Sequence, residues 1–205
     1  MSHEIYVFGS ITRGDVTPTS DIDVLVVPLS EDRSRFPAGW SIYSPSLIEE
    51  YFRKGRLFAW HLHSEARCIY SPNAKPFLDT LGQPASYSTM EKDLDELESL
   101  LSEALAEIRA KTNSLVYELG IAYTAIRDIA MSASWALLDQ PCFSRNAPYL
   151  LPIQCPVPAT AYHGAMLARH SSTRGFDVDF DLDEISQELE RAPLVNWVQS
   201  LRDAT

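Results

Sequence analysis

Residues 9–27 read GSITRGDVTPTSDIDVLVV and follow the strand-like run IYVF. The apolar runs at 4–8 and 21–27 predict two strands, because β-branched and aromatic residues dominate both and a Gly/Ser/Thr/Pro segment separates them. Gly9 allows a sharp turn directly after the first strand, where a Cβ atom would not fit. The exposed N–H groups of such a turn, together with the Ser10 hydroxyl, can bind phosphate oxygens.

Two carboxylates stand at the start of the second predicted strand. Asp21 and Asp23 are two residues apart, so their side chains emerge on the same face. Two adjacent carboxylates repel each other unless a cation lies between them, and oxygen ligands suit Mg²⁺ that also bridges to substrate phosphates. Ile22, Val24 and Val26 are expected to anchor the opposite face. A Gly-Ser turn or a D-x-D pair alone is most often a plain turn or a solvated strand face, so only the combination indicates a site.

The full string resembles the signature of the DNA polymerase β-like nucleotidyltransferase superfamily, and most closely its minimal nucleotidyltransferases, in which a G-S-x-x-R-G loop precedes S-D-I-D. The resemblance implies that Gly9 and Ser10 hold the β- and γ-phosphates of an NTP. It also implies that Asp21 and Asp23 bind Mg²⁺ or Mn²⁺ and act in catalysis, and it places Arg13 near the phosphates as a nucleotide-binding residue. The likeness is strong over residues 5–27 and extends to about residue 75.

The sequence departs from this family in two ways. Members usually have a helix before the first strand, which here begins near residue 4, so we expect either a trimmed domain or a helix that comes from elsewhere, and a stability that depends on a partner. The superfamily also places a third carboxylate on a later strand, where it helps to bind metal and to deprotonate the acceptor. Ser41 occupies the strand that we align there, and a hydroxyl is not a base at pH 7. Glu65 is the first candidate for a substitute catalytic carboxylate, and its alternative is a surface residue at a helix end.

The rest of the first half indicates a small mixed sheet with helices. Residues 40–43 and 67–70 are further strand candidates. Between them, apolar residues at helical spacing predict a helix over 45–64, which Gly55 interrupts. Residues 71–89 contain three prolines and Gly82 without a sustained period, which is typical of a linker.

The second half has a helical period throughout. Leucines and Ile108 mark one face of a long amphipathic helix that begins near residue 90, and a second helix follows to Leu137. Further helices are predicted at 158–170 and 183–201, the last broken at Pro193. The fold class is therefore α+β: a nucleotidyltransferase-like domain over residues 1–85 and an all-α helical bundle over residues 88–205. This architecture is similar to the helical partners of kanamycin-nucleotidyltransferase-like and HEPN-type proteins.

Charge and composition restrict the function further. Residues 1–89 carry 8 basic and 10 acidic side chains, whereas residues 90–205 carry 9 and 18. The net charge of −11 disfavours extended nucleic-acid binding, which depends on clustered Lys and Arg. No apolar stretch approaches a membrane span, and three cysteines without a C-x-x-C pair predict reduced thiols, so we expect a cytoplasmic protein without a membrane partner.

Other motifs give weaker signals. His61 and His63 form an H-x-H pair, but on a helix the two rings point nearly opposite ways. Asp177, Asp179, Asp181 and Glu188 have calcium-loop spacing, yet Leu182 replaces the necessary glycine, so an extended segment before a helix capped by Asp183 is the better interpretation. The second half also has no arginine and histidine at the spacing of HEPN ribonucleases.

Two functional hypotheses follow. The first is metal-dependent transfer of an NMP from an NTP to a hydroxyl of a small molecule or protein. The second is a catalytically degenerate, nucleotide-binding regulatory or antitoxin-like protein that acts through its helical domain. The intact Gly9-Ser10 and Asp21/Asp23 set favours the enzyme, and Ser41 favours the regulatory protein. The helical domain is also a candidate surface for a homodimer.

Overall fold

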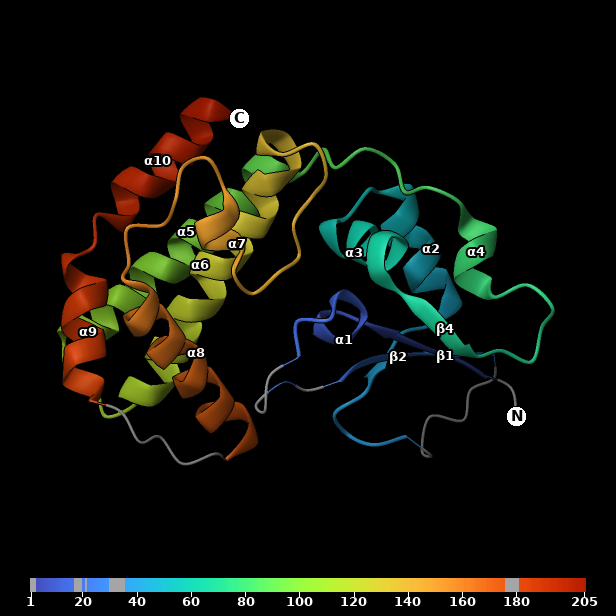
Figure 1. The fold of residues 1–205 in the computed structure, drawn as a ribbon, viewed down its shortest axis with the longest axis horizontal. Coiled ribbons are helices and arrows are strands. Elements are labelled where there is room, and N and C mark those ends of the chain that lie inside the picture. Colours follow the sequence, from blue (N-terminus) through green and yellow to red (C-terminus); the bar gives the residue numbers. More distant parts are fainter. Residues whose placement is uncertain (1–2, 17–19, 21, 30–35, 176–180) are drawn as a thin grey trace. The chain divides into compact units, whose positions relative to one another are not determined.

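The chain forms two compact units, Met1–Thr89 and Met90–Thr205. The computed structural model describes residues 3–16, 20, 22–29, 36–175 and 181–205. A four-stranded sheet with short helices forms the first unit, and helices form the second (Figure 1). The predicted α+β fold class, a small mixed sheet followed by a helical part, is confirmed.

The sheet of the first unit has the strand order β3-β2-β1-β4. The strands are β1 (His3–Phe8), β2 (Asp23–Pro28), β3 (Ser41–Ile42) and β4 (Arg67–Tyr70). β1 is antiparallel to β2 and β4, whereas β3 is parallel to β2, so the sheet is mixed. The predictions of adjacent first and second strands and of a strand at 67–70 are confirmed.

The beginning of β2 differs from the expectation. The strand starts at Asp23, and Asp21 lies outside the described residues. Ile22 precedes the strand and is 57% exposed, so its predicted anchoring role is wrong. Val24 and Val26 are buried, as the pattern predicts.

One face of the sheet packs against α2 (Pro45–Arg53) and α3 (Leu57–Glu65) (Figure 1). Burial alternates along β1, because successive side chains of a strand point to opposite faces. The buried cluster combines residues of β1, β2 and both helices: Tyr6, Phe8, Leu25, Val27, Ile48, Phe52, Ala59 and Leu62. This core fixes the ends of β1 and β2, where the site lies.

Gly55 separates the two helices, as predicted. Its φ is +61°, a conformation that favours glycine. A Cβ atom there would lie 2.2 Å from the carbonyl oxygen of Ser86 and 2.4 Å from that of Ala85. The break therefore depends both on backbone conformation and on the close approach of a later segment.

The segment predicted as a linker is instead packed onto the first unit. It contains α4 (Phe77–Leu81), and Leu78 and Tyr87 are buried. Glu4 of β1 is fully buried and accepts hydrogen bonds from Ser71 Oγ at 2.8 Å and the backbone N–H of Phe77 at 2.7 Å. The linker prediction is wrong over this stretch because a buried carboxylate ties it to the sheet.

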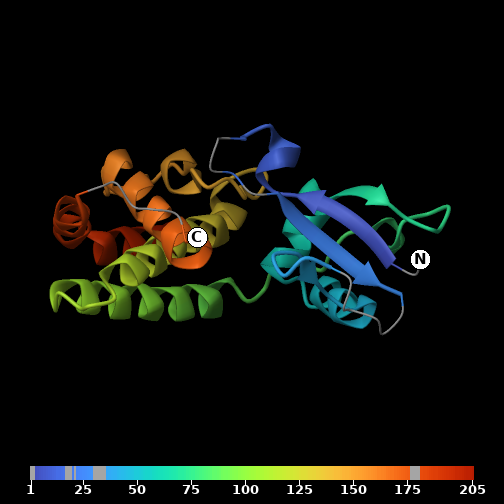
Figure 2. The same cartoon turned by 90° about the horizontal axis from the view of Figure 1, so that it is seen from below.

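The second unit is a helical bundle. Its helices are α5 (Met90–Arg109), α6 (Leu115–Leu137), α7 (Ala147–Leu150), α8 (Ala159–Arg174), α9 (Leu182–Arg191) and α10 (Leu194–Ala204). Figure 2 shows α5 and α6 joined by a short turn as a helical hairpin. α6 supplies more of the buried core than any other helix of this unit, through Leu119, Tyr123, Ile126 and Ile129 together with several alanines.

Gly120 lets α6 and α8 approach closely. A Cβ atom on Gly120 would lie 2.8 Å from the Cα atom of Arg169 on α8. Small residues at such positions bring two helix backbones together. The bundle core is therefore built from small side chains as well as from large apolar ones.

The break at Pro193 is confirmed, because α9 ends at Arg191 and α10 begins at Leu194. The cap of α9 is Asp181 rather than Asp183: its carboxylate accepts from the N–H groups of Asp183 and Glu184, both at 3.0 Å. The predicted extended segment, with Asp177 and Asp179, lies outside the described residues.

The three cysteines are free. Within the described ranges, no helix combines the length and apolarity of a membrane span.

Candidate functional site

Strand pairing brings the Gly9-Ser10 turn to Asp23. Phe8, the last residue of β1, pairs directly with Asp23, the first residue of β2. The chain then turns at Gly9, whose φ is +72°. A Cβ atom on Gly9 would lie 2.1 Å from Oδ2 of Asp23, so this position has no space for a side chain. The two motifs that the sequence separates by 13 residues thus form one corner of the sheet.

The turn continues into a single helical turn, α1 (Ser10–Arg13). The carbonyl of Gly9 accepts from the N–H groups of Thr12 at 3.1 Å and Arg13 at 3.3 Å, and from the Thr12 hydroxyl at 2.9 Å. The first N–H groups of a helical turn have no acceptor within the turn, so they can donate to a ligand. Ser10 is buried beside them, and Gly14 ends the turn in the left-handed conformation.

The structure joins two residues that the sequence analysis predicted separately, Arg13 and Glu65. Nη1 of Arg13 lies 2.5 Å from Oε2 of Glu65, although 52 residues separate them. Nε of Arg13 also contacts Asp15 Oδ2 at 3.2 Å. The Glu65 side chain is only 12% exposed, so its ion pair with Arg13 is largely shielded from water.

His61 is a third member of this cluster, and the sequence analysis missed it. Its Nε2 lies 2.9 Å from the same Oε2 atom of Glu65. Its ring packs edge-on against Phe8, with centroids 5.2 Å apart. The signal was present in the sequence, because His61 and Glu65 have the i, i+4 spacing that makes neighbours on a helix.

The other histidine of the H-x-H pair points elsewhere. His63 is exposed and its ring lies edge-on to Trp60, with centroids 5.9 Å apart. The two rings therefore have different neighbours, as expected for side chains that point in nearly opposite directions from a helix.

The donor chemistry of the corner fits a hard divalent cation. Asp23 is half-buried and offers carboxylate oxygens, Ser10 offers a hydroxyl, and the missing Cβ of Gly9 leaves the backbone close to Oδ2 of Asp23. Oxygen-only ligands suit Mg²⁺ and Mn²⁺. Among the described residues, which do not include Asp21, no three His, Cys, Asp or Glu side chains gather as a metal site.

Ser41 lies on the strand beside Asp23. β3 runs parallel to β2, and Ser41 pairs with Leu25, two residues beyond Asp23. Paired residues and residues two apart share one face of a sheet, so Ser41 and Asp23 are on the same face. The neighbouring strand thus carries a hydroxyl where the family resemblance implies a carboxylate.

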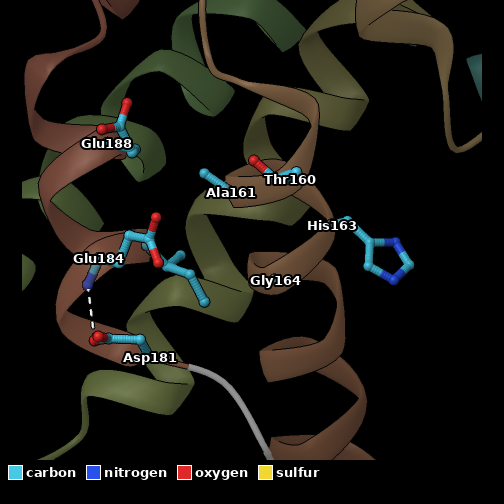
Figure 3. A pocket seen from close by; sticks show the side chains of 8 residues that line it. Thr160, Ala161, His163, Gly164, Asp181, Glu184 and Glu188 are labelled. Atoms are coloured by element: carbon cyan, nitrogen blue, oxygen red, sulfur yellow. Dashed lines mark hydrogen bonds between the residues drawn. The ribbon is translucent and has the colours of Figure 1, made fainter.

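A cavity of about 340 Å³ lies in the second unit, between α8 and α9 (Figure 3). Its polar lining is mainly acidic, with Asp181, Glu184 and Glu188 on one side. His163 also belongs to the lining, but Figure 3 shows its ring directed away from α9. Carboxylates repel a triphosphate, so this cavity is not a candidate nucleotide site.

The comparisons with known proteins agree with the geometry of the first unit. Residues 2–59 match the family model of the nucleotidyltransferase domain. A search among curated proteins found no match. The match is consistent with the polymerase β-like superfamily, and the matched residues include the whole Gly9–Asp23 corner.

Proposed function

We propose that this protein is a metal-dependent nucleotidyltransferase, which moves an NMP from an NTP to a hydroxyl of a small molecule or a protein. The observation that carries the proposal is the contact at the sheet corner, where Gly9 leaves room for Asp23 and for no side chain of its own. A nucleotidyltransferase domain supports NMP transfer in general. To this general activity the proposal adds a dependence on a divalent metal and a class of acceptor.

In this proposal the turn binds the phosphates and the carboxylates bind the metal. The N–H groups of Gly9 and Ser10, with the Ser10 hydroxyl, orient the β- and γ-phosphates, and Arg13 donates to them from the end of the same turn. Asp21 and Asp23 would hold Mg²⁺ or Mn²⁺, which supplies charge neutralisation at the phosphates.

The reaction forms a bond between the acceptor oxygen and the α-phosphorus of the NTP. The bond from the α-phosphorus to the oxygen that bridges to the β-phosphate breaks, and pyrophosphate leaves. The acceptor hydroxyl loses its proton to a base or to solvent. The protein's contribution is mainly positioning and charge stabilisation, as in other phosphoryl transfers.

The acceptor class follows from charge. The chain has a net charge of −11, and its second half carries twice as many acidic as basic side chains. Such a protein lacks a field that would hold a nucleic-acid backbone. A hydroxyl of a small molecule or of a protein is therefore the proposed acceptor.

Ser41 supports a second candidate function, a nucleotide-binding regulatory or antitoxin-like protein without turnover. The strand beside Asp23 carries this hydroxyl, which neither binds metal as an anion nor accepts a proton at pH 7. In that case the corner would bind an NTP, and the helical unit would make the functional contacts.

The test is incubation with each α-labelled NTP, Mg²⁺ or Mn²⁺, and cell extract divided into a small-molecule filtrate and retained protein. Asp23→Ala is compared with Asp79→Ala, which removes an exposed carboxylate of the same unit. The enzyme predicts label transfer by the wild type and Asp79→Ala and its loss in Asp23→Ala. Nucleotide binding without transfer in either fraction supports the regulatory function, and neither binding nor transfer contradicts both.

A further inference from the structure

Glu65 is the carboxylate that the sequence analysis offered as a catalytic base, and its surroundings point to another role. It is the last residue of α3, where the partial negative charge of the helix end disfavours a carboxylate. Two donors compensate for this unfavourable interaction, because Arg13 Nη1 and His61 Nε2 both bind Oε2 of Glu65, at 2.5 Å and 2.9 Å. A proton taken up by this carboxylate would break the pair with Arg13.

Arg13 is held on two sides by this arrangement. Its Nη1 binds Glu65, and its Nε binds Asp15. Within the described part of the chain, Nη2 has no acceptor. A guanidinium fork fixed at two of its nitrogens presents the third in a defined direction. That third nitrogen is the donor available to a phosphate oxygen.

His61 completes the arrangement from α3. It lies one helical turn before Glu65 and contacts the same carboxylate oxygen that Arg13 reaches from the turn after β1. Its ring rests against Phe8, the residue that precedes Gly9. The histidine thus fixes Glu65 relative to the same strand end that begins the nucleotide-binding turn.

We infer that Glu65 is a positioning residue for Arg13 rather than the base of the reaction, and that His61 in turn positions Glu65. The inference rests on the proposed function, because Arg13 is useful in this position only if a nucleotide phosphate binds at the corner. His61 and Glu65 thus set the position from which the Arg13 guanidinium donates to the triphosphate. Deprotonation of the acceptor is then left to another group or to solvent.

The experiment is a double-mutant cycle on Arg13→Met and Glu65→Gln, read both by titration with MgATP and by the kcat and KM of label transfer. A misplaced donor commonly costs about tenfold to a hundredfold, so each single variant should lower kcat/KM by about tenfold, mainly through KM. The double variant should lose no more than Arg13→Met alone, because Glu65 acts only through Arg13.

The matched control uses the two histidines of α3. His61→Phe keeps an aromatic ring beside Phe8 but removes the donor to Glu65, and it should raise KM by about threefold in the same sense as Glu65→Gln. His63→Phe changes the exposed histidine two residues later and should leave both constants unchanged.

Several outcomes would overturn the inference. A fall in kcat with unchanged KM in Glu65→Gln, of equal size in the Arg13→Met background, would make Glu65 a base. Unchanged MgATP affinity and transfer in Glu65→Gln would leave it no part in the site. Both results presuppose a wild type that binds MgATP, whereas a wild type that binds none would overturn the proposed function and this inference together.

Discussion

The two units of the chain bury different kinds of side chain. The first unit encloses charged groups within its sheet and helices: Glu4 is fully buried, and Arg13, Glu65 and Asp23 are at least partly buried. The second unit buries mainly alanine, leucine and isoleucine. Buried charge is costly unless it is paired, so the charged side chains of the first unit contribute less to stability than apolar side chains of the same size would. We therefore expect changes at the sheet corner of the first unit to alter chemistry and changes in the second unit to alter only stability.

The ion pairs of the second unit differ in how exposed they are. Arg202 of α10 contacts Glu91, Asp95 and Glu98 of α5 at 2.8–3.1 Å. Glu91 and Asp95 are about two-thirds exposed or more, and exposed pairs stabilise proteins only slightly. Arg202 itself is only 15% exposed, and the Arg127–Asp128 pair of α6 is about one-third exposed, so this unit also keeps some paired charge away from water.

The largest effect is expected at Gly9. In Gly9→Ala the new methyl group would overlap Oδ2 of Asp23, so transfer should fall by about a thousandfold, a loss of the size seen when one preorganised charge contact is removed. Gly82→Ala is the matched control: Gly82 has nearly the same backbone angles, φ +70° and ψ −153° against +72° and −144° at Gly9, but a Cβ atom there would have no atom of the described residues within 4 Å. Equal losses in the two variants would show that backbone strain, and not the contact with Asp23, causes the effect.

Gly120 provides the corresponding test in the second unit. Gly120→Ala places a methyl group 2.8 Å from the Arg169 backbone, and we expect overpacking to lower the free energy of unfolding by about 3 kcal/mol. Gly164→Ala meets only the end of the Ile185 side chain, which can move, so its effect should be smaller. Thermal and urea unfolding measure both. MgATP affinity should not change in either variant, and a change there would break the contrast between the units.

Glu4 gives the largest effect on stability expected from a charge. Its four partners, Tyr6, Ser71, Asn73 and Phe77, all donate to it, so the amide group of Glu4→Gln must either oppose the N–H of Phe77 or require Ser71 and Asn73 to turn acceptors toward it. One unsatisfied buried group costs about 2 kcal/mol in the free energy of unfolding, measured by urea titration. Glu50→Gln, an exposed glutamate paired with Lys54, should show no measurable change.

The same residue predicts a pH dependence. Desolvation acts to raise the pKa of Glu4, but the hydrogen bonds that its carboxylate accepts outweigh it and hold the pKa below its ordinary value. A lowered pKa in the folded state contributes stability that is present above about pH 4.5, the ordinary value, and is lost as the pH falls through the folded pKa. The wild type should therefore lose its advantage over Glu4→Gln in acid, and a constant difference would contradict this.

The sequence predicted those features whose cause is local. The turn at Gly9, the carboxylate at Asp23 and the breaks at Gly55 and Pro193 follow from residue type and spacing. The cap of α9 is Asp181 and not the predicted Asp183, because alternate aspartates offer similar caps two residues apart.

Features that depend on distant contacts were missed. Glu4 reads as the polar start of a strand, and only the folded chain shows it buried beneath Ser71 and Phe77, which is why a packed segment read as a linker. The pairing of Arg13 with Glu65 likewise requires α3 to lie beside the turn at β1, an arrangement that no local pattern specifies.

The most direct test of the central claim, that the corner of the sheet binds a metal nucleotide, is a titration of the protein with Mn²⁺ and ATP followed by electron paramagnetic resonance of free Mn²⁺. Asp23→Asn keeps the shape of the side chain but removes its charge, so the fold should persist, as thermal unfolding can show. The wild type should bind MnATP, and Asp23→Asn should bind it at least about tenfold more weakly. Equal affinity in the two proteins, with both folded, would contradict the account.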